Sequence, residues 1–132
     1  MALNVNLQYP SISTDTYSPD SLIAGMALQA VTLTATLIAG QNLTRGALLG
    51  IITASGKYTL SLAASGDGSQ IPCAVLAESA NAVSDKLVTI YVTGEFNANQ
   101  VTFGTGHSAT TAVTIAGARD NNIFFKTQPL GF

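Results

Sequence analysis

The sequence predicts a mostly β domain with one short helix, and three observations support this class. Short apolar stretches recur from about residue 30 onward, separated by segments rich in glycine, serine and asparagine. Within these stretches apolar and polar residues alternate with a period of two, which is typical of strands that bury one face. The 132 residues are enough for a single hydrophobic core, so we expect one folded domain.

Residues 1–22 are expected to form an extended arm ahead of that domain. Tyr9-Pro10 and Ser18-Pro19 disfavour a helix in this segment. Earlier in the arm, apolar and amide side chains alternate as in a strand, although no partner strand follows in the sequence. We call residues 3–8 the arm strand and expect it to pair with the sheet edge of another protein. The candidate binding residues of the arm are Leu3, Asn4, Val5, Asn6, Leu7, Gln8 and Tyr9.

Six strands are predicted in the first part of the domain, which we place at residues 23–132. They are 30–38, 46–53, 57–62, 71–77, 86–93 and 101–103. Residues 21–44 carry no charge and are long enough to span a bilayer. However, apolar residues alternate with threonines from Val31 to Leu37, which favours a half-buried strand over a membrane helix. No membrane association is expected.

The predicted strand 86–93 has two distinct faces. Val88, Ile90 and Val92 are expected to face the core. The alternate positions, among them Leu87 and Tyr91, are then expected to face outward, where they could meet a neighbouring subunit. Gly94 is expected to end the strand.

The C-terminal part combines helix-favouring alanines with β-branched residues, so propensity leaves helix and strand open. We predict a short helix over 109–119, then a turn at Asn121-Asn122 and a strand over 123–126.

Composition points to an assembly protein. Charged residues make up 9% of the chain, against about 25% in typical soluble domains. Because 47% of the residues are hydrophobic, we expect partners or further copies to cover part of the surface. The net charge is −2 and the five cations are scattered, which argues against direct nucleic-acid binding. The N-terminus lacks a secretory signal, so synthesis in the cytoplasm is expected.

Catalytic and metal-binding patterns are weak. The segment from Gly104 to Thr110 is similar to a nucleophile elbow, but Thr110 stands where the last glycine is required. The chain has one histidine, His107, and one cysteine, Cys73, which is too few for a zinc site built on these residues. Cys73 is expected to be a small buried apolar residue. No cofactor, metal or enzymatic activity is therefore expected.

Several segments resemble successive blocks of the phage head decoration family. They are Gly40 to Gly50, Asp67-Gly68, Ala74 to Ala77, Val88 to Asn97 and Ala118 to Lys126. Asn122 stands where a glycine is usual in this family, and asparagine tolerates left-handed backbone geometry better than most residues.

The resemblance implies a bent-ribbon, β-clip-like domain with an incomplete barrel. It also implies a homotrimer that sits at three-fold and quasi-three-fold positions on the outside of an expanded capsid and stabilises it against internal DNA pressure. Its partners would be further copies of itself and the major capsid protein, which the arm would join by strand pairing. Candidate contacts with a subunit or the capsid are Leu87, Tyr91, Glu95 and Phe96. A tail or baseplate module and a carbohydrate-binding or adhesin domain remain alternatives.

Overall fold

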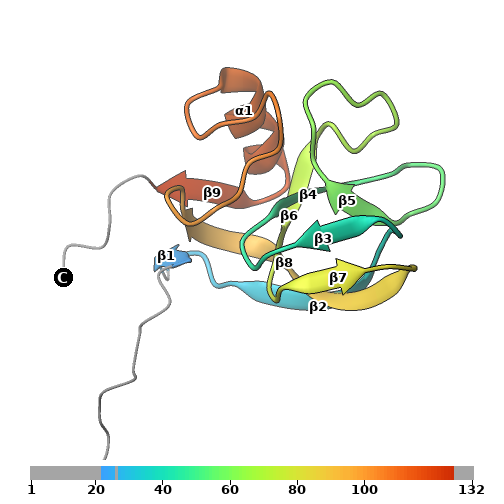
Figure 1. The fold of residues 1–132 in the computed structure, drawn as a ribbon. Coiled ribbons are helices and arrows are strands. Elements are labelled where there is room, and N and C mark those ends of the chain that lie inside the picture. The colour runs from blue at the N-terminus through green and yellow to red at the C-terminus, as the bar shows by residue number, and fades with distance from the viewer. Residues whose placement is uncertain (1–21, 26, 127–132) are drawn as a thin grey trace, which may run out of the picture.

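A computed structural model of the protein describes residues 22–25 and 27–126 (Figure 1). The arm strand and Tyr9 lie outside the described residues, as does the segment 127–132. The described chain contains one helix and nine strands. They are β1 (Ile23–Gly25), β2 (Val31–Leu37), β3 (Gln41–Leu43), β4 (Leu48–Ile51), β5 (Tyr58–Leu60), β6 (Pro72–Leu76), β7 (Ala80–Ala82), β8 (Lys86–Asn97), α1 (Ala112–Asp120) and β9 (Ile123–Lys126).

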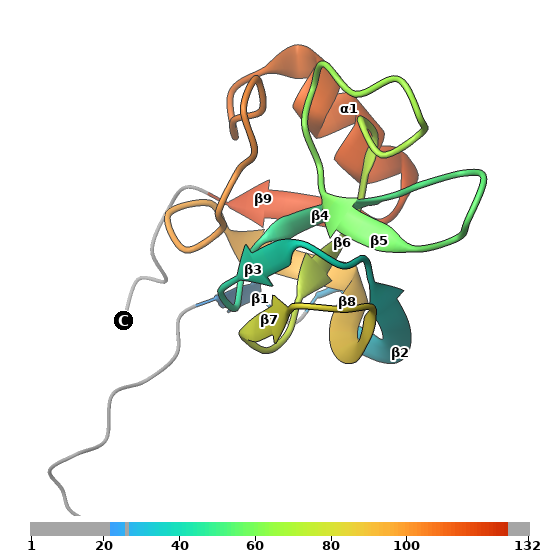
Figure 2. The ribbon, with the colours of Figure 1, turned by 45° about the vertical axis from the view of Figure 1, so that its right-hand side comes forward.

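Five of the strands form a small closed barrel in the order β8, β2, β5, β4, β6, and the pairing of β6 with β8 closes it. The strands β1 and β9 also pair with β8, whereas β3 and β7 form a separate two-stranded sheet. Figures 1 and 2 show α1 packed near β9, with the β3–β7 pair on the side of the molecule away from the helix. The mostly β class with one short helix is confirmed. The resemblance implied an incomplete barrel, whereas the barrel of this structure is closed.

The hydrophobic core consists of two clusters that share strands. The first cluster fills the barrel and includes Leu49, Leu76 and Ile90. The second lies toward α1 and β9 and includes Leu48 and Phe96. Because successive side chains of a strand point to opposite faces, Leu48 and Leu49 of β4 enter different clusters and both are fully buried.

The strand β8 is longer than predicted because Gly94 bends it instead of ending it. Gly94 has a φ of 147°, and a Cβ at this position would lie 3.0 Å from the Phe96 ring. Glycine therefore lets β8 turn sharply while its pairing continues to Asn97. The prediction that Tyr91 faces outward is wrong in part, since its side chain is half-buried against the second cluster.

The strand β2 matches its predicted range closely, but its burial differs. Leu37 is fully buried in the first cluster, whereas Val31 and Leu33 remain 46% and 55% exposed. The cause is topological: β2 pairs with β8 along its whole length but with β5 only at Leu37. The first half of β2 therefore projects beyond the barrel.

Smaller differences concern the elements that sequence reasoning placed loosely or missed. The helix begins at Ala112, and the predicted strand 101–103 is reduced to a bridge between Ala47 and Thr102. The strand 123–126 and the turn before it are confirmed, with Asn122 at a φ of 64°. The short strands β1, β3 and β7 were not predicted.

Candidate binding surface at the chain ends

The last part of β8 is paired on both sides. Phe96 lies opposite Ile23 of β1 and opposite Phe125 of β9. At the end of β8, the Asn97 amide donates to the Leu22 carbonyl at 2.8 Å, and the next amide along the chain donates to the Lys126 carbonyl at 2.8 Å. Residues 22 and 126 are thus held at the same end of one strand, and β1 and β9 both lie at the left of Figure 1. We call residues 22–25, 95–97 and 123–126 together the arm root.

Buried groups fix the arm root in place. Leu22 and Ala24 are buried, and Leu22 belongs to the second core cluster. Gly25 sits directly over Glu95, because a Cβ there would lie 2.4 Å from the carboxylate oxygen Oε1. A side chain at position 25 would therefore displace Glu95 or β1, which explains the glycine.

Glu95 connects three segments at the arm root. Its Oε1 pairs with the Lys126 ammonium at 2.5 Å, and its Oε2 accepts a hydrogen bond from the Leu28 amide at 2.7 Å. The hydrogen bond from Lys126 and then that from Leu28 hold the pKa of the Glu95 carboxyl below its usual value. The ionised carboxylate thereby joins β8, β9 and the β1–β2 connection.

A mostly apolar cavity of about 400 Å³ opens beside this ion pair. Its lining consists of Ala27, Leu28, Glu95, Phe124, Phe125 and Lys126. Phe124 is 36% exposed, which is unusual for a large aromatic side chain. The arm root therefore offers apolar surface next to the point where residues 1–21 join the domain.

The four candidate contact residues occupy different environments. Leu87 is 70% exposed, so its side chain is available to a partner. Glu95 is buried and already paired, and Phe96 has no exposed area because it fills the second cluster. Tyr91 is half-buried and holds Arg45, whose guanidinium lies 5.6 Å from the ring centroid and 3.2 Å from the hydroxyl oxygen. That these residues contact a partner remains a prediction. Because the other three are wholly or partly buried within the protomer, Leu87 is the best placed of the four for such a contact.

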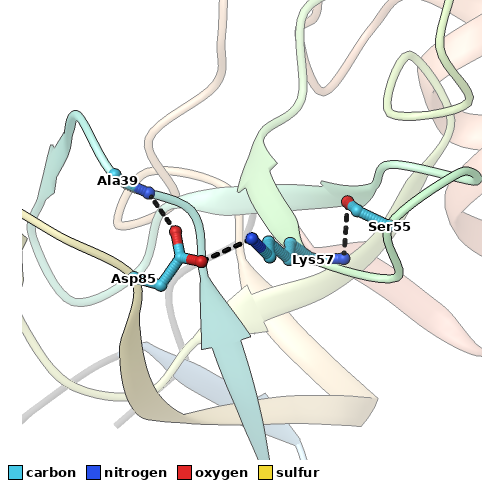
Figure 3. A network of polar contacts seen from close by, with 4 residues as sticks. All are labelled: Ala39, Ser55, Lys57 and Asp85. Atoms are coloured by element: carbon cyan, nitrogen blue, oxygen red, sulfur yellow. Dashed lines mark hydrogen bonds and ion pairs between the residues drawn. The ribbon is translucent and has the colours of Figure 1, made fainter.

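A polar clip holds the turn next to Leu87 (Figure 3). The Asp85 carboxylate accepts a hydrogen bond from the Ala39 amide at 2.9 Å and forms an ion pair with Lys57. These bonds lower the pKa of Asp85, the contact with Lys57 being the larger cause. The clip joins the starts of β5 and β8 to the end of β2, where the barrel is held by a single residue pair.

His107 lies in a buried network, in which both of its ring nitrogens contact side-chain hydroxyl groups. Its Nε2 lies 3.0 Å from Ser61 Oγ, and its Nδ1 lies 2.8 Å from Thr114 Oγ1. Ser61 Oγ donates its hydrogen to the Ser69 carbonyl at 2.7 Å, so the ring nitrogen does not hold that proton as a base would. Burial also lowers the pKa of His107. Sequence spacing gave no signal for this network, because its members come from distant segments.

The network joins α1 to the loop after β5. Thr114 occupies the place that a carboxylate takes in a serine triad, so the ring lacks the negative charge that would orient it and stabilise its charged form there. No three His, Cys, Asp or Glu side chains of the described chain gather as metal ligands. Within residues 22–25 and 27–126, no helix has the length and apolar character needed to cross a membrane.

The fold and its surfaces define a class: a small β-barrel domain whose polar side chains join its own segments and whose exposed apolar groups are suited to assembly. The family model for the bacteriophage lambda head decoration protein D matches residues 12–122. This chain belongs to that family, a family of structural capsid decoration proteins. The match begins after the arm strand, which is therefore not part of it. A comparison with curated proteins gave no match.

Proposed function

We propose that this protein binds as a homotrimer at the three-fold and quasi-three-fold sites of an expanded phage capsid and stabilises the shell against internal DNA pressure. Membership of the head decoration family, over residues 12–122, is the observation that carries the proposal. Family membership gives a role in capsid decoration. The trimer, the position on the outer surface, synthesis in the host cytoplasm and the cementing action are inferences beyond it.

In this proposal the arm strand joins a sheet edge of the major capsid protein. Strand addition needs an extended segment with alternating side chains, and residues 3–8 have that pattern. The arm root supports the idea, because Leu22 is anchored by the second core cluster and by its bond from Asn97. A force on the arm would then pass directly into β8 and the barrel.

Three arms are needed because one arm binds weakly. Ordering about ten arm residues costs on the order of 10 to 20 kcal/mol of backbone freedom. Burying three apolar arm side chains returns roughly 5 to 9 kcal/mol, and each ladder hydrogen bond adds about 0.5 to 1.5 kcal/mol. A single arm is therefore near break-even. Three arms on one rigid body raise the effective concentration and multiply affinity by about 100 to 10,000.

The test is cosedimentation of purified protein with undecorated expanded capsids. Wild type should bind and give density at three-fold sites in electron micrographs. The variant Val5→Pro removes an amide donor from the arm strand and should bind poorly. Ser11→Pro, which adds a proline outside that strand, is the matched control and should bind like wild type.

Two results would contradict this function. Equal binding of Val5→Pro and wild type would remove the arm from the mechanism. Bare shells at saturating wild-type protein would favour a tail or baseplate module, or a glycan-binding domain, over a decoration protein.

A further inference from the structure

The first half of β2 has an open hydrogen-bonding edge. At the far end of this strand, the Ile38 amide points away from β8 and donates to the Tyr58 carbonyl at 2.9 Å. The register with β8 is regular from Thr32 to Leu37, so amides alternate in direction along it. The N–H and C=O groups of Thr32 and Thr34 therefore point outward as well. Within the described residues, no hydrogen bond occupies them.

This edge lacks the charged residue and the proline that often protect an exposed strand. Edge strands of soluble proteins commonly carry a lysine, a proline or a bulge that blocks pairing with other chains. The strand β2 has no charged residue and no proline, and its pairing with β8 shifts register only at its start, between Val31 and Thr32. Val31 and Leu33 add exposed apolar side chains beside it. An unprotected edge of this kind is suited to receive a further strand.

The arm strand is the segment of this chain that fits the edge. It alternates apolar and amide side chains, carries no charge and, at six residues, is long enough to cover the open first half of β2. When it pairs along β2, its three apolar side chains can share the face of Val31 and Leu33 and cover them. Its amide side chains then fall on the other face, beside the threonines of β2.

The tether is long enough for this pairing within one chain. Leu22 lies next to Asn97, and Leu33 lies opposite Ile90 on the same edge of β8. Seven residues of strand separate these levels, which is about 23 Å at ~3.3 Å per residue. Residues 9–21 form a linker of thirteen residues, which reaches about 43 Å when extended.

We propose that in the free protein the arm strand pairs with the open edge of β2 in its own chain. The β2 edge then holds the arm strand while no partner is bound. This pairing also protects both segments from pairing with unrelated strands. The pairing itself does not depend on the proposed function. The idea that the pairing holds the arm until it binds the capsid does rest on that function.

Amide hydrogen exchange by NMR on the full chain tests the pairing. In wild type the amides of Thr32 and Thr34 should be protected. In Val5→Pro they should exchange at least about tenfold faster, because the added strand loses a donor and its extended pairing. Leu33 and Ala35 pair with β8 and should not change. Ser11→Pro is the control and should exchange like wild type. A substitution in the arm leaves the barrel intact, so misfolding cannot explain the result.

Two outcomes would overturn the proposal. The first is equal exchange of Thr32 and Thr34 in wild type and Val5→Pro. The second comes from mixing isotope-labelled Val5→Pro with excess unlabelled wild type. If the labelled Thr32 and Thr34 amides regain protection, the strand is supplied by another copy. Both readouts use the free protein, so failure here is distinct from failure to bind capsids.

Discussion

At the scale of single residues, Asn122 sets the direction of the chain between α1 and β9. Its φ is 64°, and it is the one non-glycine position with a positive φ in the described part of the chain. Its amide donates to the Arg119 carbonyl, and its carbonyl accepts from Gly94 at the bend of β8. The resemblance to the family pointed to this position, since a glycine is usual there.

Replacing this residue tests whether the left-handed geometry matters. Asn122→Ala should lower the free energy of unfolding by about 1 kcal/mol, because a Cβ without a local hydrogen-bonding group disfavours this conformation. Asn122→Gly is the matched control and should stay within about 0.5 kcal/mol of wild type. Urea titration measures both. Equal stability of the alanine and wild-type proteins would show that the backbone relaxes at no cost.

Because His107 is buried, we expect the stability of the protein to depend on pH. Its folded pKa lies below the unfolded value of about 6.5, because burial disfavours the charged ring. As pH falls below about 6.5, the unfolded chain binds the proton first, so stability decreases until the folded pKa is passed. Thermal melts between about pH 7.5 and 5 should therefore show a falling Tm. His107→Gln should flatten this part of the profile, and an unchanged slope would contradict the assignment.

At the scale of elements, the barrel is weakest where β2 meets β5. A single pair, Leu37 opposite Tyr58, and the bond from the Ile38 amide join these strands. The clip of Asp85 with Lys57 and Ala39 lies beside this seam. It compensates for the short pairing by tying the connections on both sides of it.

Removing the charge of the clip should therefore loosen the seam. In Asp85→Asn the Ile38 amide should exchange several-fold faster, while amides between β4 and β6 keep their rates. Because the pKa of Asp85 is lowered on folding, its contribution exists above about pH 3.8 and is lost as pH falls through the folded pKa. The variant should thus differ less from wild type in acid. Asp120→Asn, at the end of α1, is the control, and an effect of equal size there would refute the local role.

Most elements of this fold could be predicted from the sequence, but their connections could not. Alternation and turn residues placed β2, β4, β5, β6 and β9 within a few residues. The end of β8 was misplaced because glycine was interpreted as a strand end, although a glycine within a strand also allows a sharp bend. The exposure of Leu33 could not be predicted either, because alternation shows which side chains share a face but not whether another strand covers it.

At the scale of the whole molecule, the family could be inferred from local blocks of sequence, and the match over residues 12–122 confirms it. The contact residues were harder to choose. If β8 packed against a hydrophobic core on one face only, the side chains of Tyr91 and Leu87 would both be exposed on its other face. The second cluster covers the far end of β8, so Phe96 and much of Tyr91 lie inside the protomer. That cluster depends on β9 pairing with β8 and on α1 packing against β9 and β6, which involves residues distant in sequence.

Leu87 provides the test of subunit contact. In the proposed homotrimer, Leu87→Lys should convert much of the assembly to folded monomers in sedimentation velocity experiments, because a lysine charge would be buried in an apolar contact. Val113→Lys is a close control, since Val113 is 71% exposed and Leu87 70%. If the Leu87 variant sediments like wild type, the interface lies elsewhere on the domain.

The double role of β8 has a mechanical consequence. Its first half contributes Val88 and Ile90 to one core cluster, and its last residues contribute Phe96 to the other. Neither cluster can come apart without exposing part of the other, so the domain has no separable half. In the proposed role on a capsid, the domain should therefore stay fully folded under tension up to a threshold and then unfold in one step.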